Sequence, residues 1–217
     1  MQIRKLVFVA LAVLFFTSNL RAQEAQSKVQ QIIDLLLQGN ANFVKGKTTH
    51  PNLSSERRKL LVSGQDPIAV LVSCSDSRVP PEIVFDRGLG DLFVIRSAGN
   101  TVDKLGLGSI EYAVAILNAP LVIVMGHEYC GAVSAAESGK PLPGHIADVA
   151  KSIGPALPEN ACSMKNKLDC GILGNVDAVV NQIQNSEPIL APLVKSGKLR
   201  VIGAYYDFET GKVTLEN

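Results

Sequence analysis

The stretch Ile68-Ala-Val-Leu-Val72 decides the fold, because it is short and continuously apolar. Such a run is typical of a parallel strand that is buried on both faces of its sheet. Further strands are predicted at Leu92–Ile95, Leu121–Met125 and Leu199–Tyr206. Because helical segments separate these runs along the chain, the pattern predicts a mostly parallel sheet that is covered on both faces.

The helical segments carry apolar residues at helical spacing or begin after a break in a strand. They are Lys28–Val44, Ser55–Ser63, Leu107–Leu117, Gly131–Glu137 and Val176–Ile183. After the last long strand, Asp207–Lys212 turns the chain into the short run Val213–Leu215, which predicts a hairpin at the sheet edge. The expected fold class is therefore α/β: a mostly parallel central β-sheet with an antiparallel edge strand, flanked by helices, as one domain over residues 23–217.

Length and composition agree with one globular domain, since the chain has 217 residues of which 47% are hydrophobic. The formal net charge is +1, and no dense stripe of Lys and Arg with interleaved aromatic residues is present. The sequence therefore gives no electrostatic footprint for nucleic acid. A small substrate that is neutral or singly charged fits this composition.

The first residues have the layout of a secretory signal peptide. Arg4 and Lys5 form a basic start, Leu6–Phe16 is unbroken apolar sequence, and Ala22 offers a small residue for cleavage. The alternative is a transmembrane anchor, but a helix of this length rises only about 16 Å and a bilayer core is about 30 Å thick. We expect a signal peptide at residues 1–22, a periplasmic or secreted protein, and no membrane attachment after cleavage.

The chain has four cysteines, and export would place them in an oxidising compartment. Cys162 and Cys170 stand close together in a polar segment, which favours a disulfide bond between them. The loop-entropy estimate gives such a bond about 2–3 kcal/mol. Two free thiols are the alternative.

Three potential metal ligands follow two of the predicted strands. Cys74 comes just after the first strand, and His127 comes just after the third, with Cys130 three residues later. Sites in open α/β sheets form outside the carboxyl ends of the strands. Two thiolates and an imidazole favour zinc, and three protein ligands leave one position open, as in catalytic sites. By residue type alone, core cysteines or a Cys74–Cys130 disulfide remain alternatives.

A carboxylate and a guanidinium share the turn that follows Cys74. In an extended segment, Asp76 and Arg78 would point to the same side as Cys74. A carboxylate beside activated water can accept its proton, and a neighbouring Arg keeps that carboxylate ionised and oriented. The pattern is that of a water-activating zinc site.

These motifs resemble a known family. The stretch Cys74-Ser-Asp-Ser-Arg-Val79, with Gly126-His-Glu-Tyr-Cys-Gly131, closely resembles the two signature motifs of the β-class carbonic anhydrases. Supporting matches are Gly90–Arg96, Ala98–Asn100 and Gly108–Ala113. The resemblance runs from about Val29 to Tyr206, and it indicates an exported, bacterial-type member with the β-carbonic anhydrase fold.

The resemblance implies a lyase that hydrates carbon dioxide reversibly to bicarbonate and a proton. By it, Cys74, His127 and Cys130 are the ligands of the Zn²⁺ cofactor, and Asp76 and Arg78 form the catalytic dyad. The dyad carboxylate accepts or orients the proton of the attacking water. In a closed state, the same carboxylate would become a fourth zinc ligand.

The resemblance also assigns a substrate pocket. Gln65 matches a glutamine that hydrogen-bonds bicarbonate, and the backbone N–H of Gly131 matches a second donor. Phe93 and Tyr112 match residues of an apolar pocket for carbon dioxide that is partly supplied across a dimer interface. The expected partners are therefore carbon dioxide, bicarbonate and further copies of the chain, as a homodimer or higher homo-oligomer, with no nucleic acid.

One departure and two rival functions remain. Some family members bind regulatory bicarbonate with a Trp at the position of Leu71, and this chain has no Trp, so we expect no bicarbonate-gated switch. A zinc deaminase would need His-x-Glu followed by Pro-Cys-x-x-Cys, which the sequence lacks. A non-catalytic domain with structural zinc or a disulfide would need a fourth protein ligand or an oxidised cysteine pair.

Overall fold

The computed structural model describes residue 23, residues 26–155, residue 162 and residues 166–216. The predicted signal peptide lies outside them. Among the described helices, none is both long enough and apolar enough to span a membrane.

The core of the molecule is a five-stranded sheet in the order β2-β1-β3-β4-β5. The strands are β1 (Ala69–Cys74), β2 (Leu92–Ser97), β3 (Leu121–His127), β4 (Arg200–Tyr206) and β5 (Val213–Glu216). The first four pair in parallel, and β5 pairs antiparallel with β4 at one edge. The predicted fold class is therefore confirmed.

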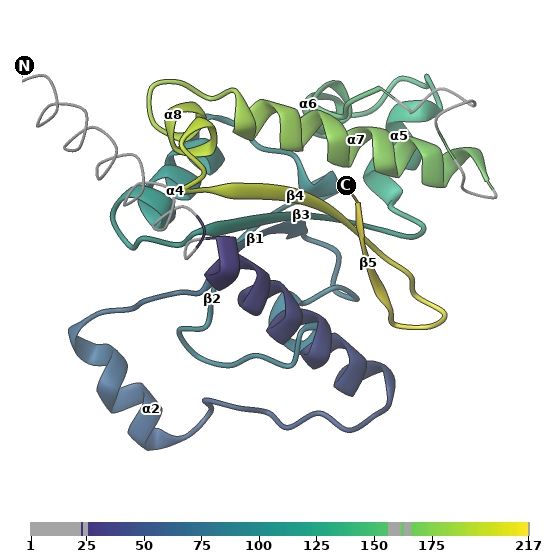
Figure 1. The fold of residues 1–217 in the computed structure, drawn as a ribbon. Helices are drawn as coiled ribbons and strands as arrows, with labels where there is room; N and C mark the ends of the chain where they lie inside the picture. The colour runs from purple at the N-terminus through teal and green to yellow at the C-terminus, as the bar shows by residue number, and fades with distance from the viewer. Residues whose placement is uncertain (1–22, 24–25, 156–161, 163–165, 217) are drawn as a thin grey trace, which may run out of the picture.

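Helices cover both faces of this sheet (Figure 1). Residues 26–44 are helical. The following helices are α2 (Ser55–Leu60), α3 (Pro81–Val84), α4 (Lys104–Ala115), α5 (Gly131–Glu137), α6 (Ile146–Lys151), α7 (Lys167–Gln184) and α8 (Leu190–Lys195). Short 3₁₀ turns lie at Leu61–Ser63 and Ala98–Asn100.

The strand residues divide between two apolar layers, because successive side chains point to opposite faces. Leu71 and Ile123 belong to the layer that contains the helix of residues 26–44, and that helix contributes Val29, Ile32, Ile33 and Leu36. Val72 and Val124 belong to the layer that contains residues of α4, α7 and α8. The residues of β1 and β3 are buried throughout, as expected for parallel strands covered on both faces.

Several details differ from the sequence-based predictions; α4, for example, spans Lys104–Ala115 rather than Leu107–Leu117. Cys74 and His127 are the last residues of β1 and β3 rather than residues just beyond them. Helix α7 begins at Lys167, nine residues before the predicted start, because the side chain of Asn166 accepts a hydrogen bond from the N–H of Asp169 and caps the helix. The short helices α3, α6 and α8 were not predicted.

Strand register brings the ends of β1 and β3 side by side. Ser73 pairs with Met125, so Cys74 lies beside the last residues of β3.

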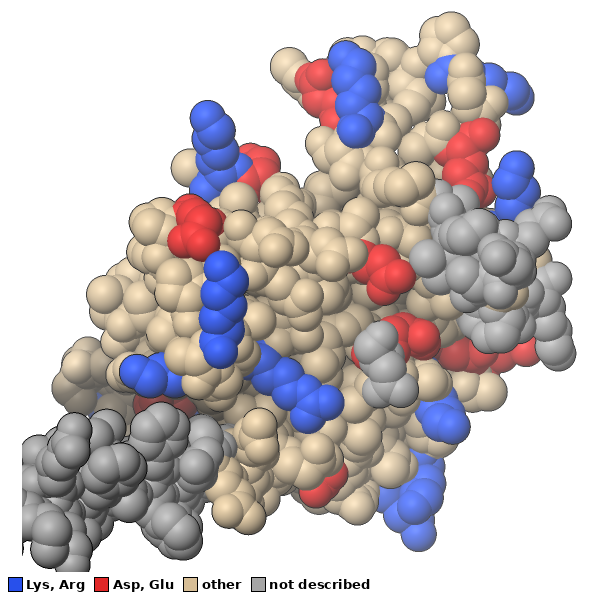
Figure 2. Space-filling view, turned by 45° about the horizontal axis from the view of Figure 1, so that its top comes forward, with Lys and Arg blue, Asp and Glu red and all other residues tan. Residues whose placement is uncertain are grey.

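On the face shown in Figure 2, acidic and basic side chains are interspersed rather than separated into regions of one sign.

Candidate functional site

A group of potential metal ligands lies at the carboxyl ends of β1 and β3. The sulfur atoms of Cys74 and Cys130 and a ring nitrogen of His127 all lie within 4.8 Å of one another. All three residues are buried, and both cysteines are free thiols. The alternative of a Cys74–Cys130 disulfide is therefore not the arrangement in the structure.

The segment after β3 is folded so that Cys130 returns toward His127. Tyr129 has a positive φ of 53°, which reverses the chain before α5 begins at Gly131. Gly126 allows α7 to pack closely on the strand, because a Cβ atom there would lie 2.7 Å from a methyl group of Val176. The His-x-x-Cys spacing thus places both ligands at one point through a turn.

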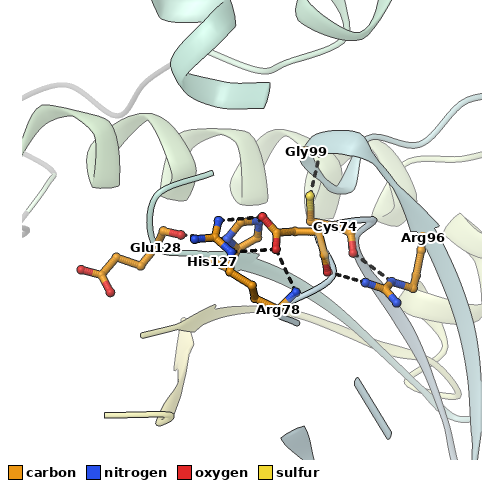
Figure 3. A network of polar contacts seen from close by, with 7 residues as sticks. Cys74, Arg78, Arg96, Gly99, His127 and Glu128 are labelled. Carbon is orange, nitrogen blue, oxygen red and sulfur yellow. Dashed lines mark hydrogen bonds and ion pairs between the residues drawn. The ribbon is translucent and has the colours of Figure 1, made fainter. Parts of the chain in front are cut away.

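The imidazole of His127 has a defined tautomer. Its Nδ1 lies 2.8 Å from the backbone oxygen of Glu128, and a carbonyl oxygen can only accept, so Nδ1 carries the proton (Figure 3). The other nitrogen, Nε2, is buried and has no hydrogen-bond partner among the described residues. An N–H to carbonyl bond of this kind is the usual support of a histidine that binds metal through its second nitrogen.

The two thiols lie close enough together that each changes the pKa of the other. The hydrogen bond from Cys130 lowers the pKa of Cys74, against the effect of burial, and His127 and backbone N–H groups add to the lowering. One of these groups is the N–H of Gly99, 3.3 Å from the sulfur of Cys74. The same hydrogen bond raises the pKa of Cys130, and burial adds to that increase. A thiolate therefore forms first at Cys74.

Asp76 and Arg78 form a bidentate ion pair at the mouth of this group. Arg78 Nε donates to Asp76 Oδ1 at 2.9 Å, and Arg78 Nη2 donates to Oδ2 at 2.7 Å. These bonds lower the pKa of Asp76 to about 2 although partial burial opposes the change. The pair arises in a turn, not in an extended segment as predicted, because the N–H of Arg78 also donates to Asp76 Oδ1 at 2.9 Å.

Arg96, the last residue of the matched stretch Gly90–Arg96, holds the same turn from the neighbouring strand β2. Its Nε donates to the backbone oxygen of Cys74 at 3.0 Å, and its Nη2 donates to that of Asp76 at 2.6 Å (Figure 3). Leu71, at the position of the family's regulatory Trp, is fully buried within β1. The guanidinium of Arg96 is therefore engaged by the backbone that carries the ligand and the dyad.

Of the predicted substrate residues, Gln65, Tyr112 and Gly131 are exposed, and Phe93 is half-buried. Gln65 and Tyr112 line one hollow of about 690 Å³, which none of the three potential ligands lines. The rings of Phe93 and Tyr112 lie 6.3 Å apart, and Gly131 is the exposed first residue of α5. One chain thus brings together the ligands and the dyad, and it places Gln65 and Tyr112 in a separate hollow.

The predicted disulfide between Cys162 and Cys170 is present, with a Cα–Cα distance of 5.7 Å. It ties residue 162 to the first turn of α7. In the same turn, the buried Asp169 accepts a hydrogen bond from the hydroxyl of Tyr205 on β4 at 2.8 Å.

Comparison with known proteins identifies the family. Residues 69–213 match the sequence model described as carbonic anhydrase. "Carbonic anhydrase 2" of Mycobacterium tuberculosis is 38% identical over 186 residues, which are 84% of this chain and 90% of that protein. A carbonic anhydrase of Mycolicibacterium smegmatis is 39% identical over the same shares of each chain.

Solved structures give the class within that family. A tetrameric β-carbonic anhydrase of Sordaria macrospora is 25% identical, with a TM-score of 0.62, over 73% of this chain and 84% of that chain. A Coccomyxa β-carbonic anhydrase in complex with acetazolamide is 29% identical, with a TM-score of 0.60, over 72% and 75%. With the mostly parallel sheet and the sequence match, these likenesses show that this chain belongs to the β class of the carbonic anhydrase family.

Proposed function

We propose that this chain catalyses the zinc-dependent, reversible hydration of carbon dioxide to bicarbonate and a proton. The observation that carries the proposal is the buried group of Cys74, His127 and Cys130 beside the ion pair of Asp76 and Arg78. Packing of a hydrophobic core does not require an ion pair beside it, and a surface ion pair does not require buried cysteine and histidine side chains next to it. Membership of the carbonic anhydrase family supports the same reaction.

The donor set of this group fits a zinc ion. Two thiols and an imidazole are ligands that zinc prefers, and the buried, unpartnered Nε2 of His127 is the kind of atom that a metal satisfies. When bound, zinc supplies the chemistry of a Lewis acid, which makes water a nucleophile near neutral pH. We therefore infer that Cys74, His127 and Cys130 hold zinc.

In this proposal, Asp76 accepts or orients a proton of the attacking water, and Arg78 orients Asp76. Asp76 is ionised at neutral pH. Its Oδ1 already accepts two hydrogen bonds from Arg78, but its Oδ2 accepts only one and keeps a free lone pair, so this oxygen can accept or orient a proton of the attacking water. Asp76 Oδ2 lies 4.0 Å from His127 Nε2. Because Arg78 holds both carboxylate oxygens, we infer the open arrangement, in which Asp76 is not a fourth ligand.

Substrate binding in this proposal uses Gln65, Phe93, Tyr112 and the backbone N–H of Gly131. The hollow shared by Gln65 and Tyr112 is bordered by Val62, whose exposed fraction is 86%. Leu89 and Tyr112 are exposed as well and line the same hollow, and exposed apolar side chains that gather in one patch mark protein interfaces. We therefore propose that a second copy of the chain covers this surface in a homodimer or higher homo-oligomer, which agrees with the tetrameric state named for the Sordaria relative.

Export to the periplasm or the cell exterior remains part of the proposal. It is supported by the basic and apolar start of the chain and by the Cys162–Cys170 disulfide, since such bonds persist in oxidising compartments. Cell fractionation with N-terminal sequencing of the recovered protein tests it. A protein that starts at residue 23 outside the cytoplasm supports export, and one that keeps residue 1 in the cytoplasm contradicts it.

Two measurements on the purified chain test the reaction. Metal analysis should find stoichiometric zinc, and stopped-flow assays with a pH indicator should show rapid hydration of carbon dioxide. Bound zinc without hydration activity would favour a structural metal site. The absence of both zinc and hydration activity would overturn the proposal.

A further inference from the structure

Phe208 contacts both the guanidinium of the dyad and the imidazole of the ligand group. The Cζ atom of Arg78 lies over its ring, 4.2 Å from the centroid. The ring centroid of His127 lies 5.3 Å away, at an interplanar angle of 56°. Neither motif that marks the site in the sequence contains Phe208, which belongs to the turn between β4 and β5.

This turn is rigidly attached to the segment that follows β3. The N–H of Phe208 donates to Oε2 of Glu128 at 3.0 Å, and the N–H of Glu128 donates to the backbone oxygen of Tyr206 at 2.9 Å. Within the turn, Asp207 Oδ1 accepts from both the N–H and the hydroxyl of Thr210, each at 2.8 Å. The ring of Tyr206 also meets that of Phe208 edge-on, with centroids 5.5 Å apart. The half-buried Phe208 ring is thereby fixed in place.

The guanidinium of Arg78 needs such a support. Its side chain is 53% exposed, and the only described carboxylate that pairs with it is that of Asp76. An exposed, flexible Arg holds an ion pair weakly, whereas an aromatic face beneath the guanidinium restricts and stabilises it. The edge of the planar group then remains free for both carboxylate oxygens.

We propose that Phe208 is a positioning residue for the reaction: its ring holds the Arg78 guanidinium flat, and Arg78 in turn keeps the Asp76 carboxylate away from the metal ligands. The expected effect of Phe208 on turnover rests on the proposed function. The contact between Phe208 and Arg78 does not depend on that function.

The test compares three single variants of the zinc-loaded protein. Phe208→Leu keeps an apolar side chain but removes the aromatic face, and Phe208→Tyr keeps the face. Phe43→Leu is the matched control, because Phe43 lies against Gly211 in the same turn and contacts neither Arg78 nor His127 in the described contacts. The readouts are kcat and KM for hydration, zinc content, and the ¹⁵N signal of the Arg78 Nε–H group.

We expect Phe208→Leu to lower kcat about three- to tenfold at unchanged zinc content, with Phe208→Tyr within about twofold of the wild type. The Arg78 Nε–H signal should broaden or shift toward that of a free arginine in Phe208→Leu only, and Phe43→Leu should leave both readouts unchanged. In an Arg78→Gln background, Phe208→Leu should have no further effect on kcat, because the two residues act in series.

Each remaining outcome is decisive. Equal losses of kcat in Phe208→Leu and Phe43→Leu would show that Phe208 acts through packing of the turn and would overturn the proposal. The same conclusion would follow if Phe208→Leu lowered kcat by the same factor in the Arg78→Gln background as in the wild type. An unchanged Arg78 signal in Phe208→Leu would overturn it as well. If the wild type does not hydrate carbon dioxide, the proposed function fails, and the Arg78 signal alone decides whether Phe208 positions the guanidinium.

Discussion

Oδ2 of Asp76 lies 4.0 Å from Nε2 of His127, close to the ligand group but bound to another partner. Both oxygens of the carboxylate accept hydrogen bonds from Arg78. Moving Asp76 onto a metal would break these charge-assisted bonds, which are the stronger kind of hydrogen bond in proteins. The geometry thus favours a carboxylate that serves the reaction over one that closes the site.

The first prediction concerns this carboxylate. Asp76→Asn keeps the size of the side chain but removes its ability to take a proton, and we expect kcat for hydration to fall about 100- to 1000-fold, as is typical for loss of a general base. Stopped-flow assays measure kcat, and metal analysis of the same sample should show unchanged zinc. Turnover equal to that of the wild type would exclude the assigned role of Asp76.

The second prediction concerns the three ligands. Cys130→Ser and His127→Ala should each lose most bound zinc, because two remaining protein ligands bind the metal weakly. Metal analysis after dialysis against a mild chelator measures the loss. The matched control is the double variant Cys162→Ala/Cys170→Ala, which removes two sulfurs outside the ligand group and should keep its zinc. Full zinc content in Cys130→Ser would show that Cys130 is not a ligand.

The strands could be predicted because their signals are local in sequence, and the ligand group could be predicted because the residues at the strand ends also matched the motifs of a known family. Continuous apolar runs marked β1 and β3, and the polar residues at the ends of such runs had to meet at one edge of a parallel sheet. The helix start at Lys167 and the short helices were missed because capping and tertiary packing, rather than apolar spacing, determine them.

The supports of the site could not be predicted, because they join residues far apart in the chain. Arg96 lies 22 residues from Cys74, whose backbone oxygen it binds, and Glu128 lies 80 residues from Phe208. Gly99 is a partial exception. Its place in Ala98–Asn100 matched the family, but only the structure shows that its N–H points at the sulfur of Cys74.

The third prediction concerns stability at Asp86, a buried carboxylate remote from the ligands. Its side chain accepts hydrogen bonds from the N–H and hydroxyl of Thr49 and from the N–H of His50, at 2.8–2.9 Å. Burial raises the pKa of Asp86, but these hydrogen bonds outweigh it and bring the pKa below its ordinary value of 3.8. The native state therefore binds its proton less readily than the unfolded chain.

The sign of the pH effect follows from that direction. With the lower pKa in the folded state, Asp86 stabilises the protein fully above pH 3.8 and loses this contribution as pH falls through the folded pKa. Asp86→Asn should lower the free energy of unfolding by about 1–3 kcal/mol at pH 7, because the amide keeps only one acceptor oxygen, and its NH₂ group then faces the donors of either Thr49 or His50. Urea denaturation measures it, and the difference from the wild type should narrow below pH 3.8.

A matched control separates this effect from the general loss of a negative charge. Asp34 is exposed on the helix of residues 26–44, and among the described side chains only Gln30 donates a hydrogen bond to its carboxylate. Asp34→Asn should change the free energy of unfolding by less than about 0.5 kcal/mol. Equal effects of the two substitutions would contradict a specific role of Asp86.

The fourth prediction concerns the disulfide between Cys162 and Cys170, which closes a loop with a sequence separation of 8 residues. A loop of this length restricts the unfolded chain and should contribute about 2–3 kcal/mol to the free energy of unfolding. The variant Cys162→Ala/Cys170→Ala should lose this amount in urea denaturation while keeping its kcat, because the bond lies at the start of α7 and outside the ligand group. Reducing agent should lower the stability of the wild type to that of the variant and leave the variant unchanged. If the oxidised wild type and the variant unfold at the same urea concentration, the disulfide contributes nothing to the free energy of unfolding, and the prediction is wrong.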